Sequence, residues 1–115
     1  KYVNPVQKEE LIEIYRDNDI FVMPSITETF GLVYAEAMSQ GLPVIYTRGQ
    51  GFDSQFEEGK VGYSVDCFDA EQLANRVIDI INRYEHLSKN CLALCPKFDW
   101  NKIANSYIHI YTEIL

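Results

Sequence analysis

The sequence predicts an α/β protein with a doubly wound parallel sheet of the Rossmann-like kind. Two short apolar runs, residues 20–23 and 44–46, are typical of strands that are covered on both faces in a parallel sheet. Amphipathic helical segments alternate with these runs, which is the pattern of βαβ units. A chain of 115 residues with neither internal repeats nor linkers is expected to form a single domain around one core.

The first half of the chain predicts alternating elements, namely strand 1–3, helix 8–17, strand 20–23, helix 31–39 and strand 44–46. Strand 1–3 is expected at a sheet edge, and strand 20–23 in the centre. The first helix carries an apolar stripe made of Leu11, Ile12 and Tyr15. The second helix is expected to end at Gly41, because a glycine followed by Leu42-Pro43 fits a C-terminal cap.

The second half predicts loop 47–59, strand 61–65 with alternating burial, a helix that follows Asp69, helix 86–95 and a last helix that follows Asp99. Asp69 and Gln72 fit a capping box. The helix after them is expected to bury one face, made of Leu73, Val77, Ile78, Ile81 and Tyr84. The last helix has a wide stripe that is interpreted as core rather than as a carbohydrate platform, formed by Trp100, Ile103, Ala104, Tyr107, Ile108, Tyr111 and Ile114.

The composition argues against several classes of partner. Seventeen acidic residues against ten basic ones give a net charge of -7, which opposes attraction to nucleic acid and to anionic lipid. No apolar run approaches the roughly 20 residues of a membrane-spanning helix. We therefore expect a soluble protein with no nucleic-acid partner and no transmembrane segment.

The cysteines and histidines are expected to have structural roles. Cys91 and Cys95 have the spacing of one helix face among leucines, and together with Cys67 they are interpreted as reduced core thiols of a cytosolic protein. His86 and His109 have no second ligand at metal-binding spacing beside them. No metal site is predicted.

A ligand site is expected where the strands end. Ligands of doubly wound sheets bind beyond the carboxyl ends of the strands, which correspond here to loops 24–30 and 47–59. The first loop leads into a helix N-terminus, whose free N–H groups and positive dipole suit a phosphate. Gly31 would allow close approach of a ligand. Glu36, on the same helix, can accept two hydrogen bonds from vicinal hydroxyls such as those of ribose.

The same segment resembles the signature block of glycosyltransferase family 4, the group 1 glycosyl transferases. The similarity rests on Pro24-Ser25-x-x-Glu28-Thr29-Phe30-Gly31-Leu32-x-x-x-Glu36-Ala37-Met38-x-x-Gly41-x-Pro43-Val44-Ile45. Glu28 and Glu36, with seven residues between them, match the E-x7-E motif of retaining enzymes with the two-domain GT-B architecture. Similarity continues outside the block, in Tyr15-Arg16-x-x-Asp19-x-Phe21-Val22 and in Phe98-Asp99-Trp100.

The resemblance implies that residues 1–115 are part of a C-terminal, nucleotide-sugar-binding Rossmann-like domain, with an N-terminal acceptor-binding domain outside them. It implies that Glu28 is the catalytic residue facing the transferred sugar. It implies further that the amides of Thr29, Phe30, Gly31 and Leu32 contact the sugar hydroxyls and the diphosphate, and that Glu36 holds the ribose.

The sequence departs from the family pattern in two places. Family members commonly have Gly-Gly-x-x-Glu after the next strand, whereas this sequence reads Gly49-Gln50-Gly51-Phe52-Asp53-Ser54, with Ser54 at the position of the glutamate. No role is therefore assigned to loop 47–59. A basic Arg/Lys pair, which the family usually places before the position of Lys1, is also absent, and a diphosphate without those cations should bind weakly.

The function implied by the resemblance is the transfer of a sugar, with retention, from a nucleoside diphosphate sugar to an acceptor hydroxyl in glycan, lipid or polysaccharide biosynthesis. No cofactor and no metal is expected, and residues 1–115 alone are expected to be inactive. The expected partners are the nucleotide sugar and the acceptor-binding domain. The expected location is the cytoplasm or the cytoplasmic face of a membrane, which the protein would reach through that other domain.

Other functions stay open at this point. The fold is also compatible with a non-catalytic nucleotide- or protein-binding module in which Glu28 and Glu36 are solvated surface carboxylates. A sugar-nucleotide epimerase or a phosphorylase of the same architecture are further alternatives. The phosphorylase would need a pyridoxal phosphate lysine, which the sequence does not identify.

Overall fold

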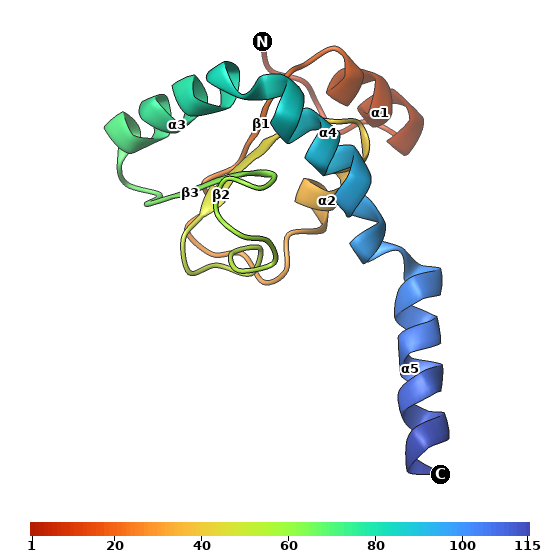
Figure 1. The fold of residues 1–115 in the computed structure, drawn as a ribbon. Helices are drawn as coiled ribbons and strands as arrows, with labels where there is room; N and C mark the ends of the chain where they lie inside the picture. The colour runs from red at the N-terminus through yellow and green to blue at the C-terminus, as the bar shows by residue number, and fades with distance from the viewer.

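The computed structural model describes residues 1–115 and contains a three-stranded parallel sheet flanked by helices (Figure 1). The strands are β1 (Phe21–Val22), β2 (Val44–Thr47) and β3 (Gly62–Val65), in the order β1-β2-β3. The helices are α1 (Lys8–Arg16), α2 (Leu32–Ser39), α3 (Ala70–Asn82), α4 (Tyr84–Leu94), the 3-10 helix η1 (Cys95–Phe98) and α5 (Trp100–Ile114). The predicted α/β class with a parallel sheet is confirmed.

Successive side chains of β2 point to opposite faces of the sheet and enter two separate cores. Val44 and Tyr46 belong to a core shared with α1 and α2, and Ile45 belongs to a core shared with α3. α4 contributes one buried side chain to each, Cys91 to the first and Leu87 to the second. Helices therefore cover both faces of the central strand, which is what a doubly wound sheet requires.

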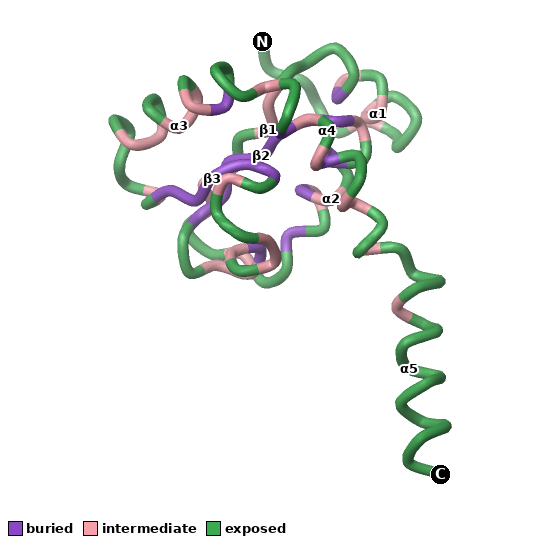
Figure 2. The backbone as a smooth tube through the Cα atoms, viewed as in Figure 1, coloured by how far each residue is buried: buried purple, intermediate pink, exposed green.

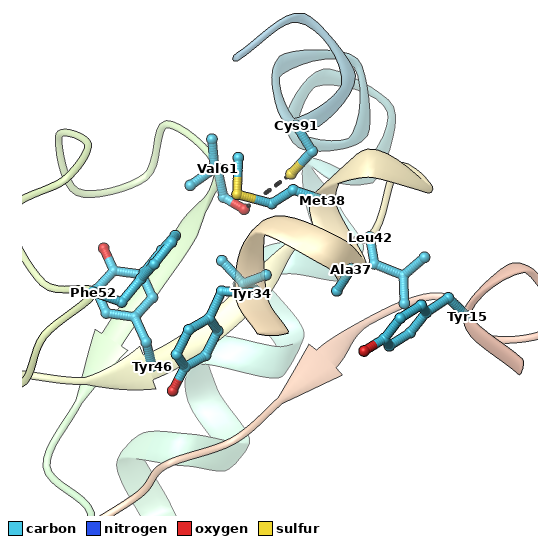
Figure 3. Close-up of a cluster of buried hydrophobic side chains, with 10 residues drawn as sticks. Tyr15, Tyr34, Ala37, Met38, Leu42, Tyr46, Phe52, Val61 and Cys91 are labelled. Atoms are coloured by element: carbon cyan, nitrogen blue, oxygen red, sulfur yellow. Dashed lines mark hydrogen bonds between the residues drawn. The ribbon is translucent and has the colours of Figure 1, made fainter. Parts of the chain in front are cut away.

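Tyr34 of α2 lies at the centre of the first core (Figure 3). Its ring centroid is 4.6 Å from that of Phe52 and 6.3 Å from that of Tyr46. Its hydroxyl donates a hydrogen bond of 2.5 Å to the carbonyl oxygen of Met23, just after β1. Burial raises the pKa of Tyr34 to about 12, and the negative charge of Glu28 adds to this shift. These contacts fix α2, and with it the loop that precedes α2, against the end of the sheet.

The end of α2 is a Schellman motif, which confirms the predicted cap at Gly41. The N–H of Gly41 donates to the carbonyl of Met38 at 2.9 Å, and the N–H of Leu42 donates to the carbonyl of Ala37 at 3.2 Å. Gly41 has φ of +82°, in the left-handed region that glycine adopts without strain. The helix therefore stops sharply and the chain turns directly into β2.

Aspartate caps begin α3 and α5, as the sequence predicts. The carboxylate of Asp69 accepts from the N–H of Gln72 at 2.9 Å, and that of Asp99 accepts from two N–H groups at the start of α5. The predicted capping box is wrong in its second half. The side-chain oxygen of Gln72 accepts from the N–H of Asp66 at 2.6 Å instead of reaching back to Asp69, so it stabilises the turn before the helix.

Three predictions about strands are wrong. Residues 1–3 form no strand, because no neighbouring segment pairs with them. β1 is an edge of this sheet rather than its central strand, since it pairs only with β2, and Val22 is 41% exposed. β3 is buried along its whole length rather than alternating, because it has helices over one face and loop 47–59 beside it.

The buried face of α3 differs from the predicted one, because it contains Ile80 in place of Ile78 and Ile81. Ile80 is fully buried and packs with Leu73 and Val77, whereas Ile78 and Ile81 are exposed. Spacings of four and three residues align positions 73, 77 and 80 on one stripe, and the other two isoleucines lie to its sides. The sequence is apolar on more than one row, so the row that meets the sheet is decided by how the helix docks.

The last helix, α5, does not enter the core, contrary to the prediction. It extends away from the rest of the molecule (Figure 1), and almost all of its length is exposed (Figure 2). The apolar stripe is on the surface, with Trp100 73% and Ile114 74% exposed. Helical periodicity predicted the helix correctly, but it did not show whether any surface among residues 1–115 covers the stripe.

All three cysteines are free thiols. Cys91 is buried, and burial raises its pKa to about 12. Cys95 is half-buried at the start of η1 and packs against the core that contains Cys91, as predicted, whereas Cys67 is half-buried and belongs to neither core, so its prediction as a core thiol is wrong. None of the helices is both long enough and apolar enough to span a lipid bilayer.

Candidate functional site

The loop between β1 and α2 is held in place by the residues that follow β2. The hydroxyl of Thr47, at the end of β2, donates to the carbonyl of Ser25 at 2.6 Å. The N–H of Gly51 donates to the carbonyl of Glu28 at 2.9 Å. The N–H of Glu28 donates to the side-chain oxygen of Gln50, also at 2.9 Å. The two loops that the sequence places at the carboxyl ends of the strands therefore lie against each other.

Glu28 is half-buried at this junction. One of its carboxylate oxygens accepts from the N–H of the next residue, Thr29, at 3.1 Å. Its Cγ lies 3.5 Å from the point where a Cβ on Gly31 would be. The acid is therefore close to the start of α2, and its charge lies beside the amide of Thr29.

Gly31 forms the N-cap of α2 with φ of +79°. A Cβ at this position would lie 2.5 Å from the Tyr34 ring, so both the backbone conformation and the packing require glycine. No side chain caps the helix, and the N–H groups of Phe30 and Gly31 donate to no acceptor in the protein. Uncapped amides at a helix N-terminus are donors that suit an anion.

Glu36 lies one turn along α2 from Leu32, and both residues line a groove of about 560 Å³. The groove runs between α1, α2 and the segment from η1 to Trp100. The hydroxyl of Tyr15 donates to the carboxylate of Glu36 at 3.4 Å. The pKa of Tyr15 is raised to about 12, first by burial and second by the charge of Glu36. Glu36 is itself exposed to solvent and lines the groove.

Phe30 connects the loop to the start of the last helix. Its ring lies edge-on to that of Phe98, with the centroids 6.0 Å apart. Phe98 also contacts Phe52 and Phe56 of loop 47–59. Lys97 adds a hydrogen bond of 2.7 Å to the carbonyl of Gln55. An aromatic cluster therefore fixes η1 beside both loops.

The structure places the six predicted site residues in the loop before α2 and in the first five residues of this helix, but not in one cavity. Glu28, Thr29, Phe30 and Gly31 form the loop, whereas Leu32 and Glu36 line the groove on one side of the helix. Four residues that contact the predicted ones were missed by sequence reasoning, namely Tyr15, Tyr34, Gln50 and Gly51. For the last two, the sequence signal was the Gly-x-Gly spacing after a buried strand, since such spacing favours close backbone contact.

The chain belongs to the family of glycosyl transferases group 1, whose family model matches residues 1–91. This confirms the resemblance stated from the motif block. The matched region contains both loops, α2 and the whole sheet.

Similar proteins agree with this membership. The chain is 34% identical to the D-inositol 3-phosphate glycosyltransferase of Corynebacterium jeikeium over 99% of the chain and 28% of that protein. Sucrose-phosphate synthase from Thermosynechococcus elongatus superimposes with a TM-score of 0.85 and 30% identity, over 99% of the chain and 30% of that structure. Anabaena HepE, solved in complex with UDP, has the same fold, with a TM-score of 0.74 and 23% identity over 90% of the chain and 29% of that structure.

The chain thus spans less than a third of the length of each of these proteins. Family membership places it among glycosyltransferases with a Rossmann-like domain. Which reaction the whole protein carries out is a separate question.

Proposed function

We propose that residues 1–115 form the donor-binding part of a retaining glycosyltransferase that uses a nucleoside diphosphate sugar. One observation carries the proposal. Glu28 precedes α2 and Glu36 lies one turn inside this helix, and in the chain between them the N–H groups of Phe30 and Gly31 have no protein acceptor. Anion-binding amides between a sugar-facing acid and a ribose-binding acid are the arrangement that a sugar nucleotide needs.

Each group has a distinct proposed role. The amides of Thr29, Phe30, Gly31 and Leu32 bind the sugar hydroxyls and the diphosphate, and the positive end of the α2 dipole favours the negative charge. Glu36 accepts hydrogen bonds from the two ribose hydroxyls, because its exposed carboxylate has acceptors for both.

Glu28 is proposed as the catalytic residue. Transfer forms a bond between the acceptor oxygen and the anomeric carbon, it breaks the bond from that carbon to the diphosphate, and the proton of the acceptor hydroxyl passes to the departing diphosphate. Positive charge develops at the anomeric carbon and negative charge on the diphosphate. Glu28 stabilises the first, and the amides at the start of α2, together with cationic side chains from outside these residues, stabilise the second. No metal ion is needed in this scheme.

The acceptor site is proposed to lie in another part of the enzyme, so residues 1–115 alone should not catalyse transfer, because both reactants must be held together. A cytoplasmic location is proposed from the three free thiols, which are typical of a reducing compartment.

The proposal is tested in the full-length enzyme with Glu36→Gln and Glu28→Gln. Binding of uridine, guanosine and adenosine diphosphates is measured by calorimetry, and turnover is measured with the corresponding diphosphate sugars. Glu36→Gln should weaken nucleoside diphosphate binding about tenfold or more, because hydrogen bonds to a charged group are worth about 1.5–3 kcal/mol. Glu28→Gln should lower kcat about 100-fold.

Glu57→Gln is the matched control, since Glu57 is an exposed glutamate in the loop after β2 whose side chain forms no hydrogen bond. It should behave like the wild type. Wild-type binding and turnover in both site variants would show that the assignment of the two acids is wrong. Failure of every nucleoside diphosphate to bind the wild-type enzyme would favour a binding module of the same fold.

A further inference from the structure

We propose that Gln50 is a positioning residue, which fixes the backbone of Glu28 and so sets the place of the acid in the site. This inference rests on the proposed function, because it concerns the residue proposed to face the transferred sugar. It assigns a role to loop 47–59, which departs from the family pattern at the position of Gln50 and at Ser54.

The backbone of Glu28 is held on both sides by two consecutive residues of the other loop. Its N–H donates to the side-chain oxygen of Gln50 at 2.9 Å, and its carbonyl accepts from the N–H of Gly51 at 2.9 Å. The backbone N–H and the backbone carbonyl of Glu28 are thus both hydrogen-bonded to loop 47–59. Loop 47–59 therefore helps to fix the direction in which the Glu28 side chain leaves the backbone, together with the contact between its carboxylate and the amide of Thr29.

Gly51 allows this contact to be so close. A Cβ on Gly51 would lie 1.9 Å from the carbonyl oxygen of Thr29 and 2.6 Å from the backbone nitrogen of Phe30. These are main-chain atoms, which cannot move aside as a flexible side chain can. Any other residue at position 51 would separate the loops, and the side chain of Gln50 would no longer reach Glu28.

Loop 47–59 is held by its own hydrogen bonds and by the core. The carboxylate of Asp53 accepts from the N–H of Gly49 at 2.7 Å and from the N–H of Ser54 at 2.9 Å, so it closes the loop on itself. The neighbouring residue, Phe52, is buried in the first core against Tyr34. Gln50 therefore projects from a loop that is anchored by its own hydrogen bonds and by the core.

The orientation of the Gln50 amide is defined by this contact. Its oxygen faces the N–H of Glu28, so its NH2 group points elsewhere, and that group forms no hydrogen bond to the protein. The side chain lines a cavity of about 350 Å³ together with Thr47 and Arg48 at the carboxyl edge of the sheet. Gln50 thus contacts Glu28 and also lines the cavity at the carboxyl edge of the sheet.

The expected consequence is on catalysis and not on nucleotide binding. Catalytic groups must be held within about 0.5 Å of the productive geometry, and a displacement of about 1 Å can cost about 100-fold in rate. Glu36 and the amides of Thr29, Phe30, Gly31 and Leu32, which are proposed to bind the nucleotide, form no hydrogen bond to Gln50. Loss of the Gln50 oxygen should therefore lower kcat and leave nucleoside diphosphate affinity almost unchanged.

The test uses the full-length enzyme and the variant Gln50→Met, which keeps the length and volume of the side chain but has no acceptor oxygen. Turnover is measured as nucleoside diphosphate release from uridine, guanosine and adenosine diphosphate sugars, and affinity is measured by calorimetry with the nucleoside diphosphates. We expect kcat to fall about 10- to 100-fold and Kd to stay within about twofold. Gln50→Glu, which restores an acceptor oxygen at the same distance, should recover most of kcat.

Gln55→Met is the matched control, because Gln55 lies in the same loop and its side chain forms no hydrogen bond. Amide hydrogen exchange of Glu28 gives a second measurement, and this amide should exchange faster in Gln50→Met than in Gln55→Met. Equal kcat for these two variants, or no recovery in Gln50→Glu, would overturn the role of Gln50. If instead Glu28→Gln itself has wild-type kcat, the proposed function fails, and the two failures are thereby distinguished.

Discussion

Ser88 of α4 donates a hydrogen bond of 2.7 Å to the carbonyl oxygen of Gly41, 47 residues earlier in the chain. The contact joins α4 to the turn at which α2 ends and β2 begins. Because the start of α2 carries the proposed site, the position of the site depends on how firmly the other end of this helix is held.

Substitution of Gly41 should therefore destabilise the fold. In Gly41→Ala, the alanine must adopt the left-handed backbone φ of +82°, and its Cβ would lie 3.1 Å from Oγ of Ser88. The free energy of unfolding, measured by urea denaturation, should fall by about 1–2 kcal/mol.

Gly49→Ala is the control for backbone strain alone. Gly49 has a similar φ of +80°, but no atom lies within 4 Å of the place where its Cβ would be. Its variant should lose about 1 kcal/mol or less. Equal losses in the two variants would show that the contact with Ser88 adds nothing to the strain.

Stability should decrease at alkaline pH because of the buried tyrosines. The folded pKa of Tyr34 and of Tyr15 is about 12, against 10.0 for a free tyrosine. Between these values the unfolded chain releases a proton that the folded chain keeps, so the free energy of unfolding falls as pH rises. One such group contributes a slope of at most about 1.4 kcal/mol per pH unit.

Tyr34→Phe removes one of these two tyrosines, so the free energy of unfolding should fall less steeply with pH. The slope is measured by urea denaturation at several pH values from about 8 to 11. The same variant loses the hydrogen bond to Met23, which should cost about 1 kcal/mol near neutral pH. Tyr107→Phe changes an exposed tyrosine and should leave the wild-type slope. An unchanged slope in Tyr34→Phe would contradict the prediction.

The two aspartate caps should differ in their effect on global stability. Asp69 begins a helix that packs on the sheet, whereas Asp99 begins a helix with no buried residue. In residues 1–115, Asp69→Ala should lower the melting temperature in calorimetry, because a lost cap costs about 1 kcal/mol. Asp99→Ala should reduce the helical circular dichroism signal and leave the main transition almost unmoved. A large shift for Asp99→Ala would mean that α5 is coupled to the core.

Amide exchange should separate α5 from the rest of residues 1–115. An isolated helix of about 15 residues is marginal in water, and α5 buries none of its side chains. Its amides should exchange much faster than those of α2 and β2, measured by hydrogen exchange with mass spectrometry. Protection of α5 equal to that of β2 would show that its apolar stripe is covered in solution.

Local sequence patterns predicted most elements of this fold. The cap at Gly41, the capping aspartates and the buried run of β2 are decided by residues close together in the chain, so their signals are local. The motif block likewise placed Glu28 in the loop before one helix and Glu36 inside that helix.

What could not be predicted depends on contacts between distant segments. The exposure of the α5 stripe, and the choice of Ile80 rather than Ile81 as the buried residue, are decided by which surfaces meet. The contact between Glu28 and Gln50 joins residues 22 positions apart in two loops without periodic structure. No local pattern specifies such a contact, so the sequence alone does not assign a role to loop 47–59.

The hydrogen bond from the amide of Thr29 to the carboxylate of Glu28 has a consequence for affinity. A ligand that takes this amide must first displace the carboxylate, so part of its binding energy is used to exchange one anion for another. Once displaced, the carboxylate of Glu28 is free to turn towards the bound ligand. In the proposed site, ligand binding would therefore change the place where the negative charge of Glu28 is held.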